Sequence, residues 1–256
     1  MTDRRRRYPP IFGLEVAPAR PRLHKPGMSA LESFGESIWT ASGGAVTSAG
    51  FRYPTRMAVA RLANGALWVW SPVALSADVR AGVDALGEVA HIVAPNSLHH
   101  VFLPEWKSAY PRAHVYAAPG LRARRKDIAF DADLTEAPPA AWAGEIDQAV
   151  VRGNVITTEV VFFHRASGTV LFTDILQNFP PGWFKGWRAV IAKMDRMLEP
   201  MPAVPRKFRV AFTDRKAARV SVAKILDWPA QQVLMAHGDP VRANGAGFLK
   251  EAFAWL

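Results

Sequence analysis

The sequence predicts an α/β (α+β) fold, an αββα sandwich of two mixed sheets flanked by helices. Three observations support this prediction. A hairpin and then a β–α–β unit lie in the first half, three successive strands lie between residues 148 and 173, and the C-terminal part is mainly helical. A plain doubly wound sheet is the alternative, but it has no natural place for the three successive strands.

Residues 1–28 form a basic segment with few aliphatic side chains. They contain seven Lys or Arg and two acids, and so carry +5 of the net charge of +10. Such segments bury too little apolar surface to fold, and we predict a disordered or loosely attached arm. Residues 29–256 are expected to form a single domain, which is long enough to bury a large core.

The composition excludes several classes of protein. No apolar run approaches the ~20 residues of a membrane-spanning helix, and no apolar stretch follows the arginines near the N-terminus as in a secretory signal. The chain has no cysteine, which rules out disulfides, thiolate metal sites and a cysteine nucleophile. We therefore expect a cytoplasmic protein without a membrane partner.

The first half of the chain shows clear local signals for strands and turns. Asn64-Gly65 joins two β-prone runs and predicts a hairpin. A helix follows with apolar residues at i, i+4 and i+7, and Gly87 ends it. The expected elements are strands at 37–41, 51–53, 57–62 and 66–70, a helix at 79–86, a strand at 91–94, a helix at 103–110 and a strand at 114–118. Gly43-Gly44 is expected to separate the first two strands.

The second half begins with residues 122–145, which mix charge with Pro and Gly and are expected to be mostly loop. Thr213 or Asp214 is the expected N-cap of the second of two helices that precede the last strand. The expected elements are strands at 148–152, 158–163 and 169–173, helices at 183–198 and 213–227, a strand at 232–236 and a helix at 247–255.

Three of these apolar strands end in side chains that can bind a metal or transfer a proton. Residues 91–94 lead into Pro95-Asn96-Ser97-Leu98-His99-His100, the strand at 169–173 ends at Asp174, and the strand at 232–236 ends at His237. Open α/β sheets place their ligand sites at the C-terminal edge of their strands. The sequence therefore predicts a metal or acid–base site where these three ends meet.

Several stretches together resemble a known family. They are Trp39-Thr40, Phe51 to Met57, Ser71 to Val73, Val93 to His100, Ala118 to Leu121, Val161 to Arg165 and Ala236 to Gly238. As an ordered set they resemble a branch of the metallo-β-lactamase fold superfamily that is described as a domain of unknown function (DUF4336). The likeness spans about residues 37–256, and it implies a metallo-β-lactamase-like αββα sandwich.

The resemblance also implies a metal-site pattern, from which the first half of this chain departs. The superfamily's first motif is an Asp that ends an early strand, and Ser71 takes that place here. Its second motif has the form His-x-His-x-Asp-His, of which only the last position is matched, by His100. His99 stands at the Asp position, and Pro95 and Ser97 stand at the first two His positions.

The later motifs are matched more fully. Asn154 falls at the His of the third motif, whereas Asp174 and His237 match the fourth and fifth. A two-metal site uses a bridging carboxylate and about five other ligands, so the resemblance implies at most a mononuclear site. One divalent ion, Zn or Fe, could be held by His99 or His100 with Asp174 and His237, and a site without metal stays open.

The candidate metal ligands His99, His100, Asp174 and His237 are also the candidate catalytic groups. For each of them, a purely structural role is the alternative. One ring of the His pair could be buried and hydrogen-bonded while the other is solvated, Asp174 could cap the next turn, and His237 could serve turn chemistry. Arg52 and Arg56 could meet an anionic substrate or form salt bridges. Four further polar residues are expected to hydrogen-bond behind the ligands: Ser71, Asn96, Asn154 and His164.

Three functions are compatible with these features. The first is a hydrolase that acts on a small-molecule ester, amide or phosphoester. The second is a non-catalytic member of the same fold that serves as a binding or scaffold module. The third, a nucleic-acid-associated protein, has the least support, because half of the excess charge lies in the arm and no recognition motif is visible.

Overall fold

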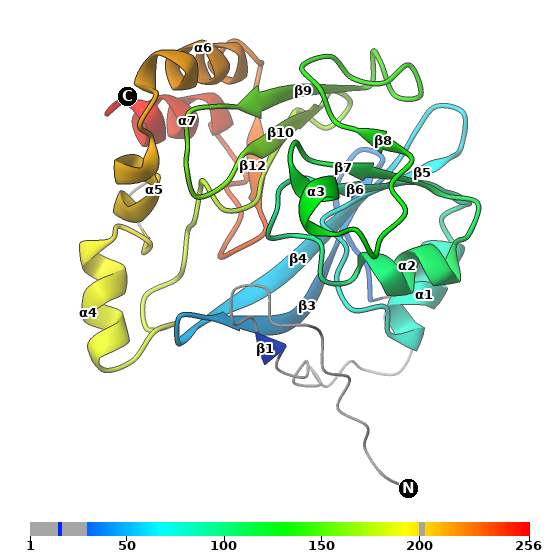
Figure 1. The fold of residues 1–256 in the computed structure, drawn as a ribbon, viewed down its shortest axis with the longest axis horizontal. Coiled ribbons are helices and arrows are strands. Elements are labelled where there is room, and N and C mark those ends of the chain that lie inside the picture. Colours follow the sequence, from blue (N-terminus) through cyan, green and yellow to red (C-terminus); the bar gives the residue numbers. More distant parts are fainter. Residues whose placement is uncertain (1–14, 17–29, 200–202) are drawn as a thin grey trace, which may run out of the picture.

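The computed structural model describes residues 15–16, 30–199 and 203–256. Two sheets are stacked on each other, and helices cover their outer faces (Figure 1). The αββα sandwich expected from the sequence is therefore confirmed. None of the helices that the structure describes has the length and apolar character needed to span a bilayer.

The first sheet has the strand order β1-β3-β4-β5-β6-β7-β8, with β2 paired to β3. Its strands are β1 (Glu15–Val16), β2 (Glu32–Gly35), β3 (Ile38–Ser48), β4 (Phe51–Arg61), β5 (Leu67–Trp70), β6 (Val89–Ala94), β7 (His114–Ala117) and β8 (Ala132–Asp133). Pairing is antiparallel up to β5 and parallel from β5 to β8. The C-terminal ends of β5 and β6 therefore lie at the same edge of the sheet.

The second sheet has the order β12-β11-β10-β9. Its strands are β9 (Ile146–Val151), β10 (Glu159–His164), β11 (Thr169–Phe172) and β12 (Gln232–Met235). β9, β10 and β11 form an antiparallel meander, and β12 is parallel to β11. The parallel pair brings the residues that follow β11 and β12 to one edge.

The helices divide between the two outer faces. α1 (Ala77–Asp84), α2 (Leu103–Ala109) and α3 (Leu121–Arg124) pack on the first sheet, and α5 (Arg206–Ala211), α6 (Arg215–Leu226) and α7 (Gly245–Phe253) pack on the second. α4 (Trp187–Met194) stands at the edge of the molecule, next to the end of the β3–β4 hairpin (Figure 1). Asp214 caps α6 as expected, and its side chain accepts from the N–H of Ala217.

The core between the sheets is built by alternation along the strands. In β5, Trp68 and Trp70 point into the space between the sheets, whereas Leu67 and Val69 point to the outer helices. All four side chains are fully buried, which explains why this strand reads as a continuous apolar run. Each such side chain contributes about 1.5–3 kcal/mol through the apolar surface that it removes from water.

The start of the first sheet differs from the prediction. Gly43-Gly44 does not separate two strands, because β3 continues through both glycines with a shift in register between Ser42 and Ala45. A Cβ on Gly43 would lie 2.3 Å from Thr55 Oγ1, so glycine permits the close approach of β4 here. The expected break was therefore wrong, and the glycines mark a β-bulge.

The predicted N-terminal arm lies mostly outside the described residues. Its one described part, Glu15–Val16, forms β1 and pairs with Val46 and Thr47 of β3.

Candidate metal centre

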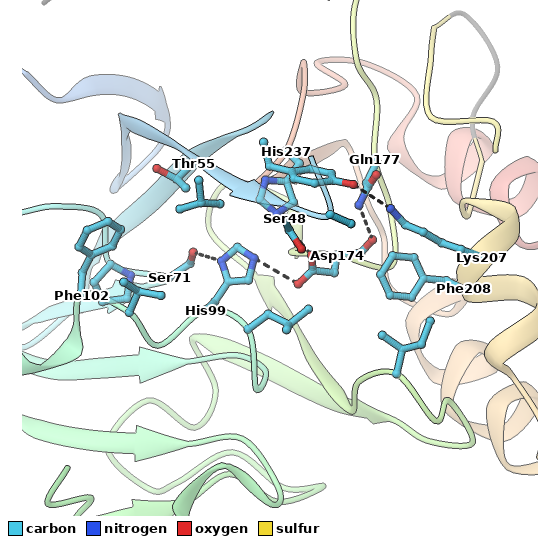
Figure 2. Close-up of a pocket in the computed structure, with 17 residues that line it drawn as sticks. Ser48, Thr55, Ser71, His99, Phe102, Asp174, Gln177, Lys207, Phe208 and His237 are labelled. Carbon is cyan, nitrogen blue, oxygen red and sulfur yellow. Dashed lines mark hydrogen bonds and ion pairs between the residues drawn. The ribbon is translucent and has the colours of Figure 1, made fainter. Parts of the chain in front are cut away.

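His99, Asp174 and His237 meet at the edge where β6, β11 and β12 end (Figure 2). His99 Nε2 lies 3.2 Å from Asp174 Oδ2, and His237 Nε2 lies 3.4 Å from Asp174 Oδ1. One potential ligand atom from each residue lies within 4.8 Å of the other two. The structure thus brings together three residues that the strand-end pattern singled out.

The hydrogen bonds of Ser71 determine which nitrogen of His99 carries the proton. Ser71 Oγ donates to the carbonyl of Arg56 at 3.2 Å and lies 2.8 Å from His99 Nδ1. Because the hydroxyl has a single proton and the carbonyl can only accept, Ser71 Oγ accepts from His99 Nδ1–H. In the neutral ring, His99 Nε2 then carries no proton, and its lone pair points at Asp174.

The same reasoning applies to His237. Its Nδ1 lies 2.7 Å from the carbonyl oxygen of Pro54, which has no proton to give. His237 Nδ1 is therefore the donor, and its Nε2 also directs a lone pair at Asp174 in the neutral ring. Metal-binding histidines in proteins almost always donate their other ring N–H to a carbonyl or similar acceptor in this way.

With both rings neutral, two lone pairs would face one carboxylate, so the cluster needs a positive charge, from protons on both Nε2 atoms or from a bound cation. Burial on its own would raise the pKa of Asp174, but the positive charges of His99 and His237 when protonated, and their hydrogen bonds, hold it well below its usual range, so the carboxylate is anionic. A divalent cation would satisfy all three groups at once. The two N···O distances, 3.2 and 3.4 Å, involve different oxygens of Asp174, and each is close to the ~3.3 Å that separates two ligands bound at ~2.0 Å, so the three residues could hold one ion.

Asn96 ties the loop of His99 to that of Asp174. Its Nδ2 donates to Asp174 Oδ2 at 2.6 Å and to Thr173 Oγ1 at 2.8 Å, while its Oδ1 accepts from the N–H of His99 at 2.9 Å. Asn96 is fully buried. It therefore fixes Asp174 through a bond to its side chain and His99 through a bond to its backbone. The sequence analysis expected Asn96 behind the candidate ligands.

Glu159, at the start of β10, is a residue of the site that the sequence analysis missed. It is fully buried and accepts three backbone N–H bonds, from Thr173 at 2.6 Å, Asp174 at 2.9 Å and Ile175 at 3.0 Å. Burial raises its pKa, the charge of Asp174 adds to this, and the three N–H donors oppose it. The available signal was an acid that begins an otherwise apolar strand.

Arg56 and Gly238 hold the loop that carries His237. Arg56 Nη1 donates to the carbonyls of Met235 at 2.5 Å and Gly238 at 2.7 Å, so this side chain serves the protein's own backbone. Gly238 has φ +91°, and a Cβ there would lie 2.1 Å from the carbonyl oxygen of Asn178. Only glycine fits this position, which explains why a glycine follows His237.

His100 does not join the cluster, although it was a candidate for both catalysis and metal binding. It is buried, and its Nδ1 contacts Nη1 of the buried Arg125 at 2.5 Å. Burial, and then the charge of Arg125, lower the pKa of His100 to about 4. Of the two histidines that the sequence left open, His99 is the one that reaches Asp174.

Asn154 and His164 were also expected behind the ligands, and the structure places them elsewhere. Asn154 shapes the loop between β9 and β10, where its Oδ1 accepts from the N–H of Ile156 at 3.0 Å and its Nδ2 donates to the carbonyl of Phe208 at 3.0 Å. His164 ends β10 at the opposite edge of the sheet from Asp174, and its Nδ1 lies 2.7 Å from Ser167 Oγ. Both roles are structural.

His164 predicts an acid-sensitive fold. Burial lowers its pKa to about 4, from an ordinary value of 6.5. Below about pH 6.5 the unfolded chain gains a proton that the folded protein does not take up, so stability present above that pH is lost as the pH falls towards 4. We expect His164 to account for about 3 kcal/mol of this loss. Urea unfolding between pH 7.5 and 4 should show a smaller loss in His164→Gln, and an unchanged loss would contradict this role.

A cavity of about 290 Å³ opens beside the cluster. Its wall is largely apolar and includes Tyr53, Leu98, Val101, Phe102, Ile156 and Phe208. Lys207 and Gln177 add polar groups (Figure 2). Lys207 Nζ lies 3.0 Å from the hydroxyl of Tyr53, and the buried Gln177 Oε1 has no hydrogen-bond partner among the described residues. The cavity can therefore hold a small molecule with an apolar body and a few polar contacts.

Solved structures with this arrangement of layers include metallo-β-lactamases. The DIM-1 metallo-β-lactamase exposed to ceftazidime is 15% identical with a TM-score of 0.58, covering 92% of this chain and 96% of its own. FIM-1 from Pseudomonas aeruginosa in its mono-zinc form is 12% identical with a TM-score of 0.55, covering 86% and 91%. A metallo-β-lactamase from Hirschia baltica is 10% identical with a TM-score of 0.58, covering 86% and 94%. At these identities the likeness shows the fold alone, which is the metallo-β-lactamase fold.

The chain belongs to the family described as a domain of unknown function (DUF4336), which it matches over residues 37–182, more than half of its length. Comparison with the curated proteins finds no match. The resemblance inferred from the sequence is thereby confirmed at the level of both family and fold.

Proposed function

We propose that this protein is a hydrolase that uses one divalent metal ion held by His99, Asp174 and His237. The observation that carries the proposal is that two imidazoles, each donating from Nδ1 to a protein oxygen, direct their Nε2 atoms at one buried carboxylate. Two imidazoles and one carboxylate form a ligand set that suits Zn or Fe(II). When bound, such an ion supplies Lewis-acid chemistry and lowers the pKa of water.

A single ion is proposed because positions that the metallo-β-lactamase superfamily uses for further ligands serve other purposes here. Ser71 has a hydroxyl that orients His99, and Asn154 has an amide that is used by the β9–β10 loop. The mono-zinc form of FIM-1 supports the view that this fold can hold one zinc ion.

The remaining residues would bind and orient the substrate, which we propose to be an ester, amide or phosphoester. The apolar wall would hold its body and exclude water. Lys207, with its side-chain amine at the cavity, would bind an anionic or carbonyl oxygen of the substrate. Hydrolysis of ester, lactam and phosphodiester panels by the metal-loaded protein tests this proposal, and activity that survives in Asp174→Asn would contradict it.

Ser71→Ala tests the orientation of His99. Residues that orient a ligand typically change metal affinity by ~10–100-fold, and we expect a loss of that size for Zn²⁺ in competition with a chromophoric chelator. Ser221→Ala is the matched control, because Ser221 is also buried and hydrogen-bonded but lies on α6. Equal affinities for the two variants would show that the bond from His99 to Ser71 does not support a ligand.

A non-catalytic binding module is the second candidate function. The observation in its favour is that the N···O distances of 3.2 and 3.4 Å also suit two protonated imidazoles paired with Asp174, which would close the cluster without metal. Absence of bound metal together with no hydrolysis in any panel would favour this candidate.

A further inference from the structure

α4 presents an apolar stripe to solvent. Trp187, Val190, Ile191 and Met194 occupy positions i, i+3, i+4 and i+7, which is the spacing of one helix face. All four are exposed, Val190 by 60% and Met194 by 62%. Trp183, just before the helix, is exposed as well. In a globular protein this face would normally be covered by another element.

The exposure does not come from a loosely held helix. Ala192 packs on the opposite side in a small core with Phe51, Phe184 and Met197. Arg188 Nε donates to the carbonyl of Gly50 at 2.7 Å and Trp183 Nε1 to that of Arg52 at 3.1 Å. The helix is therefore fixed beside the β3–β4 hairpin (Figure 1), and its apolar stripe stays exposed.

Cations accompany the stripe. Lys185, Arg188, Lys193 and Arg196 lie within or beside α4. Asp195 is the only acid between residues 183 and 198, and it is largely buried beside Lys207, from whose backbone N–H it accepts at 2.8 Å. The exposed surface formed by Trp183 and α4 is thus apolar in the middle and positive around it.

We propose that this α4 surface docks on an anionic lipid membrane. An amphipathic helix with Trp and aliphatic residues on one face and Lys and Arg beside them binds in the interface plane, where tryptophan is enriched. Negative headgroups attract the cations. A second copy of this surface, or the chain's own Arg4–Arg7 segment, would bring like charges together.

This proposal revises the expectation from the sequence that no membrane takes part. The α4 surface also adjoins the candidate site, because the β3–β4 hairpin that anchors α4 contributes Ser48, Ala49 and Tyr53 to the cavity wall. Membrane docking would therefore place the cavity close to lipids.

Sedimentation of the full-length protein with vesicles tests the proposal. One set of vesicles is phosphatidylcholine alone and the other contains about 30% phosphatidylglycerol, chosen because anionic headgroups attract Lys and Arg. Val190→Asp is compared with Val220→Asp on α6, since the two valines are 60% and 59% exposed and the charge change is the same. A third variant replaces Arg4–Arg7 by Gln, which separates the contribution of the basic arm.

The wild-type protein is expected to bind the anionic vesicles and to bind the neutral ones more weakly. Val190→Asp should lower the partition coefficient by about tenfold or more, in the Arg4–Arg7 variant as well, and Val220→Asp should change it by less than about twofold. No binding to anionic vesicles would overturn the proposal, and so would equal losses in the two Asp variants. The oligomeric state without vesicles is measured by sedimentation velocity. A dimer that is abolished by Val190→Asp would instead assign the surface to a second copy.

Discussion

Asp174→Asn is expected to weaken the binding of Zn²⁺ by more than about 100-fold, since changes to residues that only orient a ligand already cost ~10–100-fold. The substitution keeps the size of the side chain but removes the negative charge that faces His99 Nε2 and His237 Nε2. The amide can also donate to one of these lone pairs and so take it out of use. Competition with a chromophoric chelator measures the affinity.

Asp195→Asn is the control for Asp174→Asn. Both carboxylates are largely buried, with side-chain exposures of 14% and 10%, and both pair with a basic residue, but Asp195 lies beside α4 and pairs with Lys207. We expect its effect on Zn²⁺ affinity to be less than about threefold, since it touches none of the ligands. Equal affinities for the two variants would show that Asp174 is not a ligand.

Glu159→Ala is expected to destabilise the protein by about 3 kcal/mol or more, because three buried N–H groups lose their acceptor at ~1–3 kcal/mol each. Relief of the repulsion between Glu159 and Asp174 offsets part of this cost. The free energy of unfolding is measured by urea denaturation at pH 7. The affinity for Zn²⁺ should fall as well, because Glu159 accepts from the backbone N–H of Asp174.

Two further variants show whether the loss of stability comes from the lost acceptor oxygens of Glu159. Glu159→Gln keeps one acceptor oxygen and should lose less stability than Glu159→Ala. Glu251→Ala removes an exposed glutamate from α7 and should change stability by no more than about 0.5 kcal/mol. A loss in Glu159→Ala as small as in Glu251→Ala would contradict the role assigned to Glu159.

Much of the fold could be predicted because its signals are local. The Asn64-Gly65 hairpin and the apolar strand at 66–70 depend on neighbouring residues, and the structure has both. α5 was missed because it has only six residues and follows a proline-rich stretch. The Gly43 bulge was misread because its cause, the close approach of Thr55, comes from another strand.

The candidate site was predictable to the level of strand ends and no further. The apolar run at 91–94 places His99 and His100 just after the end of β6. The choice between them depends on Arg125, which lies 25 residues after His100 in the chain and contacts the ring of His100. Glu159 was missed because its partners are backbone groups that follow β11. Such contacts between distant segments produce no recognisable residue pattern in the sequence.

The metal content of the full-length protein tests the central claim most directly. Wild-type protein and Asp174→Asn, prepared side by side and dialysed against the same buffer with Zn²⁺ or Fe²⁺, are compared by elemental mass spectrometry and native mass spectrometry. The proposed centre predicts one ion per chain in the wild-type protein and almost none in the variant. Two tightly bound ions per chain, or the same content in both proteins, would contradict it.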